Sequence, residues 1–574
     1  MSRTDRGTDA DFGELSRAGR AWWRAVLRTE RDRRLAIRMG RPITAPNLRR
    51  LLSRRLARVG ADWPMCEDAA RHISSALAAG MGQFINSTPA TCGRRNTNMG
   101  TEAKQLNFDT LKDAISGHAA AIRCKTILQP AAGCGTKVFP PTHAGGVYAT
   151  EQRRVPDKDK PGETRVVDCV LLDSVQSQAN RIEDALQQAI DDGKLSMPLI
   201  VVNFGDAVAD VQRVTSLQAP HRAADAILRD SLTDQKDEKG KPLPFRKSTI
   251  GEAITNSSLA NATGQFRYCP HALFLGVWDS TGPKGGLGAK FARALVSEIV
   301  GIDAAYGVRT GSRIDPIQTK TSAGPLYTKD VDKFGGIEWT LDPNEALKDK
   351  KTKNPILFSR GNVATGKPGD PAKANHGNIP PTFSKYAKGA EGTDPLTGED
   401  ARQGAIAAGG TTIDHAEHTA VLSLPQLRRL RFPLNGALNS DPKKQAEIDN
   451  AARTVLAALA LVGLTLSLER GCDLRSRCLL FPEGPLSFEL LEIPGKPTPI
   501  SLDSAHAIAI YNEAVEKAIG AGLPWHANAS LLEKREKYNA ITLSPSPELI
   551  ALAKKSEELA KAGVEGDDAT GGNT

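Results

Sequence analysis

The residues best suited to chemistry lie in one glycine-rich stretch, WDSTGPKGGLGAKFARALVSEIVG, at 278–301. It holds four glycines within seven residues, accompanied by three cations: Gly282, Gly285, Gly286 and Gly288, with Lys284, Lys290 and Arg293. The spacing of Phe291, Leu295 and Ile299 predicts a helix after the loop. Free backbone N–H groups before a helix can bind a phosphate. Cations in a first helical turn cost about 0.3–1 kcal/mol each unless an anion is bound there. We therefore expect an anion site, with tight strand–helix packing as the alternative explanation.

The spacing of these glycines excludes the two common nucleotide-binding motifs. In G-x-x-x-x-G-K-[ST] a lysine and a hydroxyl residue follow the second glycine, but here Ala289 and Lys290 follow Gly288, and Phe291 replaces the hydroxyl. The dinucleotide pattern G-x-G-x-x-G fails as well, because the glycines are spaced 3, 1 and 2 residues apart. The loop therefore favours neither a nucleoside triphosphate nor a dinucleotide.

Other basic and polar side chains sit beside predicted turns or on the polar side of a predicted helix. They are Lys137, Arg153, Arg154, Gln176, Asn180, Arg181, His221, Arg222, Arg313, Arg428, Arg429 and Arg431. Each one alone also fits a solvated surface. Aromatic residues make up only 5% of the chain and no RNP1 pattern occurs, so an aromatic platform for bases is poorly supplied. Any nucleic acid should be held through its backbone with little sequence preference.

The sequence gives little support for catalysis or metal binding. DHAEH (414–418) places two histidines three residues apart, and on a strand they would face opposite ways. Eight cysteines are scattered without a CxxC pair, which favours free thiols in a reducing cytoplasm over a zinc site. We predict no catalytic residue, no metal site and no cofactor.

The net charge of +9 is concentrated at one end of the chain. Residues 1–98 hold 19 arginines, no lysine and 9 acidic residues, a net +10, and the remaining 476 residues hold 56 basic and 57 acidic ones. Two explanations remain open for this segment. It is either a basic RNA-binding extension or upstream sequence translated from a start codon assigned too early, and we favour the second. The overall charge therefore does not indicate function.

Hydrophobic patterns place the supporting elements. Strands are predicted at 121–129, 166–174, 199–204 and 271–280, and near 464–470 and 477–492; helices are predicted after residue 174 and over 219–231, 443–461, 503–520 and 547–562. Residues 411–432 are predicted to form a strand and then a short basic turn or helix. Lys, Gly and Pro dominate 320–410, which indicates an insertion. The longest apolar run, 454–468, has 15 residues and is too short to span a bilayer, and no secretory signal is present.

Several long phrases carry a resemblance to a known family. CKTILQPAAGCGTKVFPPTHAGGVYA, CVLLDSVQSQANRIEDAL, TSLQAPHRAADAILRDS, the glycine-rich stretch and GSRIDPI occur in family order from about Met99 to the 490s. The sequence resembles the CRISPR-associated RAMP-superfamily backbone subunit that binds crRNA in the subtype I-G (formerly I-U) Cascade complex.

This resemblance implies an α+β fold with an RRM-like (ferredoxin-like) palm and long finger or thumb insertions. The corresponding division is an extension at 1–98, a first palm part at 99–320, an insertion at 321–410, a second palm part at 411–520 and C-terminal helices with a tail at 521–574. It also implies a cytoplasmic, non-enzymatic ribonucleoprotein subunit. Its expected partners are crRNA, further copies of itself, other Cascade subunits and, through the guide, target DNA, with no membrane.

The resemblance also gives the glycine loop a role, because a guide holder must bind phosphates without reading bases. We expect Gly282, Lys284, Gly285, Gly286, Gly288, Lys290 and Arg293 to hold guide phosphates. Two alternatives stay open. One is a RAMP-type endoribonuclease that processes CRISPR RNA with His221 or the DHAEH segment, and the other is a protein scaffold that binds no RNA.

Overall fold

The computed structural model describes residues 103–143, 146–157, 160–208, 211–282, 290–360, 366–384, 408–525 and 540–561. The chain divides into two units, Met1–Thr97 and Asn98–Thr574, and all described residues belong to the second. The Arg-rich segment 1–98, the loop residues Lys284, Gly285, Gly286 and Gly288, and the tail after residue 561 lie outside the described residues. The predictions made for them therefore stay predictions.

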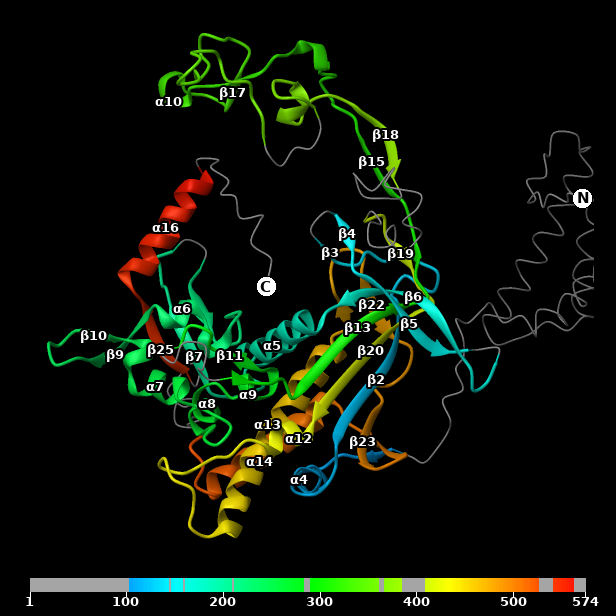
Figure 1. The fold of residues 1–574 in the computed structure, drawn as a ribbon, viewed down its shortest axis with the longest axis vertical. Coiled ribbons are helices and arrows are strands. Elements are labelled where there is room, and N and C mark those ends of the chain that lie inside the picture. The colour runs from blue at the N-terminus through cyan, green and yellow to red at the C-terminus, as the bar shows by residue number, and fades with distance from the viewer. Residues whose placement is uncertain are drawn as a thin grey trace, which may run out of the picture. The chain divides into compact units, whose positions relative to one another are not determined.

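A ten-stranded sheet forms the framework of the second unit (Figure 1). Its strands follow the order β1 (Lys104–Gln105), β24 (Lys496–Ser501), β23 (Phe488–Ile493), β2 (Ala121–Pro130), β20 (His415–Ser423), β13 (Leu295–Ile302), β6 (Thr164–Asp173) and β5 (Thr150–Pro156). Off this path, β22 (Leu479–Pro482) pairs with β2 and with β21 (Cys472–Asp473). Neighbouring strands run antiparallel except for β1 and β24. Together with the helices, these antiparallel strands agree with the predicted α+β class.

Alternation along the strands gives the sheet two different faces. In β2, Ile122 and Cys124 are buried, whereas Arg123 and Lys125 lie on the opposite face. Cross-strand ion pairs balance that opposite face, where Arg123 pairs with Glu489 on β23 and Lys125 pairs with Glu417 on β20 at 2.8 Å. Because each of these cations already has a carboxylate partner, this face carries little net positive charge.

Two long helices cover the buried face. α5 (Val175–Asp191) begins where the Ser174 hydroxyl accepts from the Ser177 amide, and α13 (Pro442–Glu469) begins after the Asp441 cap. The two helices meet at Gly463, where a Cβ would stand 2.7 Å from a methyl group of Ile182. α4 (Phe108–Ser116) and α14 (Ser504–Gly520) also pack on α13. α13 therefore runs through the centre of the helical layer.

By length and composition, α13 is apolar enough to cross a membrane. However, 89% of its most apolar window is buried inside the protein. Its apolar side chains are already covered by other parts of the chain. This burial is typical of the core helix of a soluble protein.

The chain order through the central strands is β2, α5, β13, β20, α13 and then β22 and β23. In space, β22 and β23 lie beside β2, β2 beside β20, and β20 beside β13. In the chain order, the hairpin of β5 and β6 lies between β2 and α5. In the sheet, it adds two strands at the edge next to β13.

A second, five-stranded sheet has the order β10 (Pro242–Pro244), β9 (Ser231–Lys236), β25 (Ala540–Pro545), β7 (Leu199–Asn203) and β8 (Arg213–Thr215). β25 comes from the C-terminal region, yet it pairs with both β7 and β9. α16 (Pro547–Lys561) follows it. Short elements surround this sheet, namely η2 (Arg222–Ala224), α6 (Ala226–Arg229), η3 (Phe245–Lys247), α7 (Thr249–Thr255), α8 (Thr263–Tyr268) and α9 (His271–Leu275).

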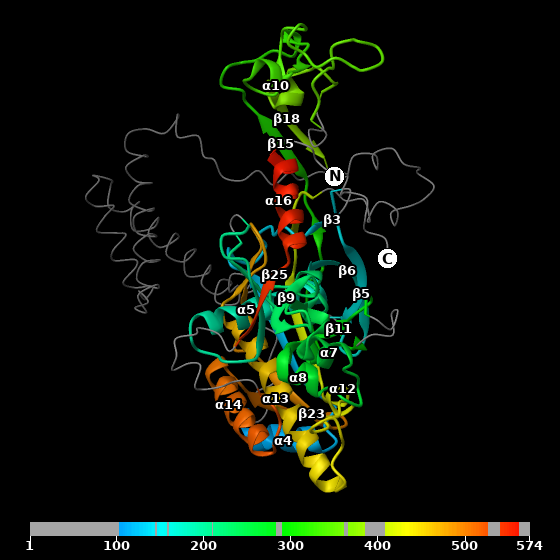
Figure 2. The same ribbon diagram turned by 90° about the vertical axis from the view of Figure 1, so that its left-hand side faces the viewer.

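An insertion joins β13 to β20. Its base is the pair β14 (Ala305–Tyr306) with β19 (Thr411–Thr412), followed by the ribbon β15 (Arg309–Arg313) with β18 (Ile379–Ser384). The ribbon carries short distal elements: η4 (Thr321–Ala323), β16 (Tyr327–Thr328), α10 (Val331–Phe334), β17 (Trp339–Thr340) and η5 (Pro371–Ala374) (Figure 2). The segment between β13 and β20 begins before residue 320, and the described part of 320–410 contains regular elements.

Several predicted elements are confirmed: the strands at 121–129, 166–174 and 199–204, the strand and short helix within 411–432, and the helices after 174 and over 443–461, 503–520 and 547–562. The strand predicted at 464–470 is wrong, because α13 continues to Glu469. The single helix predicted over 219–231 is instead η2 and α6, and the strand at 271–280 is reduced to β11 (Val277–Trp278) after α9.

The helix predicted after the glycine loop is also wrong. Residues 290–302 form β12 (Lys290–Phe291) and β13, in which Leu295, Ser297 and Ile299 alternate into the core. The spacing of four that suggested a helix is equally compatible with a strand, because four is a multiple of two. Pairing with β6 and β20 on both sides decides in favour of the strand.

Candidate nucleic-acid interface

The described ends of the glycine loop belong to a β-hairpin. In it, β11 pairs with β12 through Val277 with Phe291 and Trp278 with Lys290. Val277 and Phe291 point into the core, so Lys290 is exposed on the outer side. Since residues 290–302, where the helix was expected, form β12 and β13, they provide no helix dipole to support an anion. A phosphate at this loop would depend on backbone amides and on the neighbouring cations.

A buried ion pair anchors the start of this hairpin. Arg222 is only 7% exposed, and its Nε and Nη2 donate to the Glu183 carboxylate at 2.7 and 2.9 Å. Its Nη1 donates to the carbonyl of Gly276 at 3.0 Å. Burial raises the pKa of Glu183 to about 7, and the Arg222 charge opposes that rise. Arg222 therefore fastens the hairpin to α5 and does not face solvent, whereas its neighbour His221 is exposed.

Two further side chains face the same ion pair. His271 is fully buried, and its Nε2 donates to the carbonyl of Ser216 at 3.0 Å. Burial, and then the Arg222 charge, lower the pKa of His271 to about 3, so the ring is neutral. Arg293 is half-buried, and its pKa is lowered by burial and by Arg222. The network thus holds two guanidinium groups and one carboxyl group.

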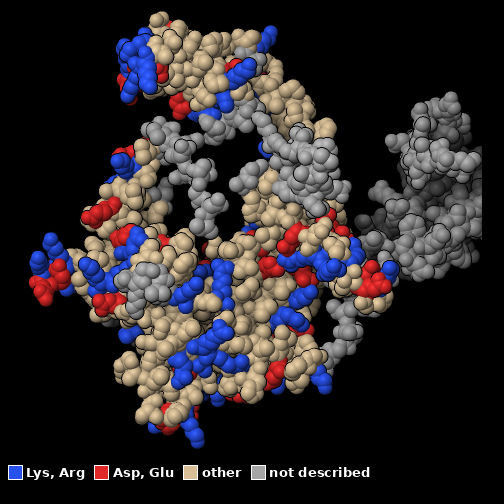
Figure 3. Space-filling model, viewed as in Figure 1, with Lys and Arg blue, Asp and Glu red and all other residues tan. Residues whose placement is uncertain are grey.

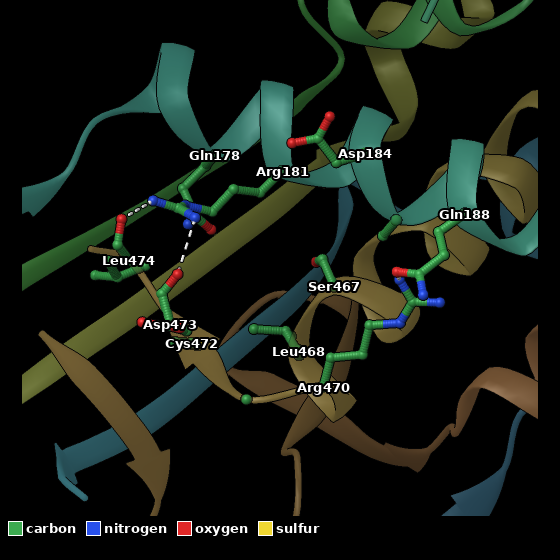
Figure 4. Close-up of a pocket in the computed structure, with 12 residues that line it drawn as sticks. Gln178, Arg181, Asp184, Gln188, Ser467, Leu468, Arg470, Cys472, Asp473 and Leu474 are labelled. Carbon is green, nitrogen blue, oxygen red and sulfur yellow. Dashed lines mark hydrogen bonds between the residues drawn. The ribbon is translucent and has the colours of Figure 1, made fainter. Parts of the chain in front are cut away.

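Arg181 belongs to a second buried network. The carboxylate of Asp173 is fully buried and accepts from Nε of Arg181 at 2.9 Å and from Gln178 at 2.6 Å. Arg181 also donates to the carbonyls of Leu474 at 2.6 Å and Asp473 at 3.2 Å, as Figure 4 shows. Arg181 therefore ties α5 to the β21 hairpin. Gln176 and Asn180 are exposed on α5, as their predicted polar side requires.

A cavity of about 170 Å³ opens beside Arg181, between α5 and the end of α13 (Figure 4). Arg470 lines it and donates to the side chain of Gln188. Asp184 and Asp473 contribute carboxylates. Because both charge signs line this cavity, it favours no single class of ligand.

The base of the insertion positions two cations. Lys137 lies against Gly307 and Gly410, where a Cβ at Gly307 would come within 2.6 Å of the Lys137 Nζ. The Arg477 guanidinium stacks 4.1 Å from the centroid of the Phe139 ring. Arg477 is exposed and was not selected from the sequence, because its position beside Phe139 depends on the β21–β22 turn. Both cations therefore lie near the base of the insertion.

Three other predicted arginines have different surroundings. Arg153 pairs with Glu151 and, at 3.2 Å, with Glu298. Arg154 is exposed, and within the described ranges it forms no ion pair. Arg313 donates to the carbonyls of Gly377 and His376 at 2.8 and 2.7 Å, so it braces the ribbon of the insertion.

Lys and Arg side chains gather on one face over α9, α12 (Leu424–Arg428) and α13 (Figure 3). Arg429 and Arg431 are exposed in the segment that follows α12, and Arg431 pairs with Asp449 at 2.6 Å. Arg428 instead donates to the carbonyls of Ala114 and Ile115 at the end of α4. The three arginines are neighbours in the sequence but have different roles in the structure. Arg428 caps the end of α4, whereas Arg429 and Arg431 are surface cations.

The histidines of DHAEH are positioned by the core. His415 lies beside Asp414, 2.8 Å from its carboxylate, and His418 is completely buried on the opposite face of β20. Nε2 of His418 lies 2.8 Å from the Ser297 hydroxyl, which in turn lies 2.8 Å from Oε1 of Gln178. No group of three or more His, Cys, Asp or Glu suited to a metal ion occurs among the residues the structure describes. The Ser297–His418 contact is inaccessible to a substrate.

The comparison with protein families gives one match. Residues 122–306 match the family described as CRISPR-associated protein GSU0053 (Cas_GSU0053). The matched range runs from β2 to β14, and it includes α5, the Glu183–Arg222 pair and the β11–β12 hairpin. No curated protein matches the chain. The family match supports a CRISPR-associated protein.

Proposed function

We propose that the protein is a crRNA-binding backbone subunit of a type I Cascade complex, similar to that of subtype I-G. Several copies would hold the guide through its phosphates and present its bases to target DNA. The match of residues 122–306 to a CRISPR-associated family is the observation that carries this proposal.

The connectivity of the central sheet supports an RRM-like palm. The chain order β2, α5, β13, β20, α13 and β22 has the β-α-β-β-α-β pattern of ferredoxin-like units. The spatial order β22, β2, β20 and β13 places the fourth strand beside the first and the third strand between the first and second. The insertion then falls between the second and third palm strands, and we propose it as the thumb or finger.

The distribution of charge supports backbone contacts. Lys137 and Arg477 stand at the base of the insertion, and Lys290 and Arg154 are exposed cations without a described carboxylate partner. A guide carries arbitrary sequence, so its holder must recognise phosphates, which every nucleotide has. Dispersed cations on separate elements suit an RNA strand that runs past several parts of the protein.

The test is co-expression of the full chain with a CRISPR array, followed by purification and sequencing of bound RNA. Enrichment of array-derived spacer RNA is expected, and RNA of random cellular origin or none at all would contradict the proposal. Lys137→Glu with Arg477→Glu should reduce bound RNA at least about tenfold, because two phosphate contacts are reversed. Lys443→Glu with Lys444→Glu, at the exposed start of α13, makes the same charge change and should leave it within about twofold.

The endoribonuclease alternative makes a different prediction in the same system. Its candidate general base is the exposed His221, since His418 is buried. If His221→Ala leaves a full-length array transcript bound where the wild-type chain holds short guides, the protein processes RNA itself. A backbone subunit should instead retain the same guide lengths in both proteins.

A further inference from the structure

An exposed tryptophan stands beside a lysine on the β11–β12 hairpin. Trp278 is 54% exposed, and Nζ of Lys290 lies 5.0 Å from the centroid of its ring. Alternation fixes this orientation, because the neighbouring Val277 and Phe291 point into the core. Lys290 forms no ion pair within the described ranges of the chain. The pair therefore offers an aromatic face and a positive charge to a ligand.

Both ends of β11 are held before any ligand arrives. On the β11 side, Gly276 has a φ of 86°, which disfavours a side chain, and Arg222 binds its carbonyl. After β11, Arg246 donates to the Asp279 carboxylate and to the carbonyl of Thr281, both at 2.7 Å. A recognition group on a rigid support loses little conformational entropy when it binds.

The charge around the hairpin favours an anionic ligand. Arg293 lies near Arg222 and Glu183, and like Lys290 it has no ion pair to a described residue. Glu183 is already occupied by both donors of Arg222. A negative group near Lys290 would be stabilised, whereas a metal ion or a basic peptide would be repelled.

We propose that Trp278 and Lys290 form a stacking site for one unpaired base of single-stranded RNA. The base stacks on the indole ring, and the Lys290 ammonium moves to the adjacent phosphate. This inference rests on the proposed function, which supplies the single-stranded guide. Stacking accepts any base, because each base has a π face, and so it is compatible with a guide of arbitrary sequence.

Two labelled probes of about 20 units separate stacking from charge: oligoadenylate, and an abasic ribose-phosphate chain of the same length. Trp278→Ala in the full-length protein should weaken oligoadenylate binding about 5- to 100-fold, and Trp278→Phe should weaken it less, because one stacking contact is lost or reduced. Binding of the abasic chain should be the same for all three proteins. Lys290→Ala should lower the slope of log affinity against log salt by about 0.7 for both probes.

The matched control is Phe481→Ala. Phe481 on β22 is also an exposed aromatic residue, 65% exposed, and it lies outside the insertion and the β11–β12 hairpin. It should leave oligoadenylate binding within about twofold of wild type. Equal affinities of wild type and Trp278→Ala for oligoadenylate would overturn the stacking site and leave the proposed function intact. Failure of the wild-type protein to bind oligoadenylate, or to carry array-derived RNA, would count against the proposed function itself.

Discussion

Buried polar side chains in this protein are connected in chains that fix their protonation. The Gln178 amide donates to Asp173, so its oxygen accepts from the Ser297 hydroxyl. Nε2 of His418 must then donate to that hydroxyl, which leaves Nδ1 unprotonated. Among the described atoms this Nδ1 has no hydrogen-bond partner. Protonation of His418 would place an uncompensated charge in the core.

This arrangement predicts loss of stability in acid. Burial lowers the pKa of His418 to about 4, below the value of about 6.5 in an unfolded chain. As the pH falls through this window, the unfolded state takes up the proton first, so folding stability decreases. The glutamine of His418→Gln does not titrate. When the pH falls from 7 to 5, the unfolding free energy of this variant should therefore decrease by about 2 kcal/mol less than that of the wild type. Urea unfolding at both pH values measures the difference.

His221→Gln is the control, because it makes the same substitution at an exposed histidine outside the core. It should show the same pH dependence as wild type. If His418→Gln also tracks wild type from pH 7 to 5, His418 does not titrate with a lowered pKa.

At the scale of elements, the close contact between α5 and α13 depends on one glycine. Gly463 lies within α13, where glycine is normally unfavourable by about 1 kcal/mol relative to alanine. A Cβ there would stand 2.7 Å from Cγ2 of Ile182 and 3.3 Å from Leu186. The glycine therefore allows α5 and α13 to approach each other, which holds Glu183 in position for Arg222.

Gly463→Ala should destabilise the protein by about 1–3 kcal/mol, because overpacking outweighs the gain in helix propensity. Gly520→Ala in α14 is the matched control, since nothing lies within 4 Å of its added Cβ, and it should be neutral or stabilising by up to about 1 kcal/mol. Urea midpoints at constant m-value measure both changes. If Gly463→Ala and Gly520→Ala stabilise the protein equally, α5 and α13 do not pack closely at Gly463.

At the scale of the whole molecule, the distal part of the insertion is held together by hydrogen bonds between its own residues. The amide of Leu326 donates to Gly369 and that of Phe358 donates to Leu326, at 2.7 and 2.9 Å. The Asp315 carboxylate accepts from the Gly377 amide at 2.6 Å. These contacts close the distal part above the Arg313–Ile379 pair of the ribbon.

Replacement of residues 314–378 by Asn-Gly, which forms a tight hairpin turn, should therefore leave the ten-stranded sheet and its helices folded. We expect the variant to melt cooperatively, with a melting temperature within a few degrees of that of the wild type. Circular dichroism measures this transition. Guide protection should decline if the insertion is the thumb. A variant that precipitates or melts without cooperativity would show that the ten-stranded sheet depends on the distal part of the insertion. Unchanged guide protection would rule out the proposed role of the insertion as a thumb.

The sequence by itself determined the elements whose pattern is local and unambiguous. β2, β6, α5, α14 and α16 follow from alternation, four-residue spacing and caps such as Ser174. The long phrases also indicated a CRISPR-associated family, which the match of residues 122–306 supports. The prediction that Gln176 and Asn180 lie on a polar helix face needed only that periodicity.

Only the tertiary structure decided which cations are exposed and what residues 290–302 become. Strand pairing on two sides converted an apparent helix into β12 and β13, and the resulting alternation exposed Trp278 while burying Phe291. Arg222 and Arg181 looked like surface residues in the sequence, yet partners far along the chain, Gly276 and Leu474, hold them in place. Burial and ion pairing depend on contacts between distant segments, and a local pattern of residue types cannot contain that information.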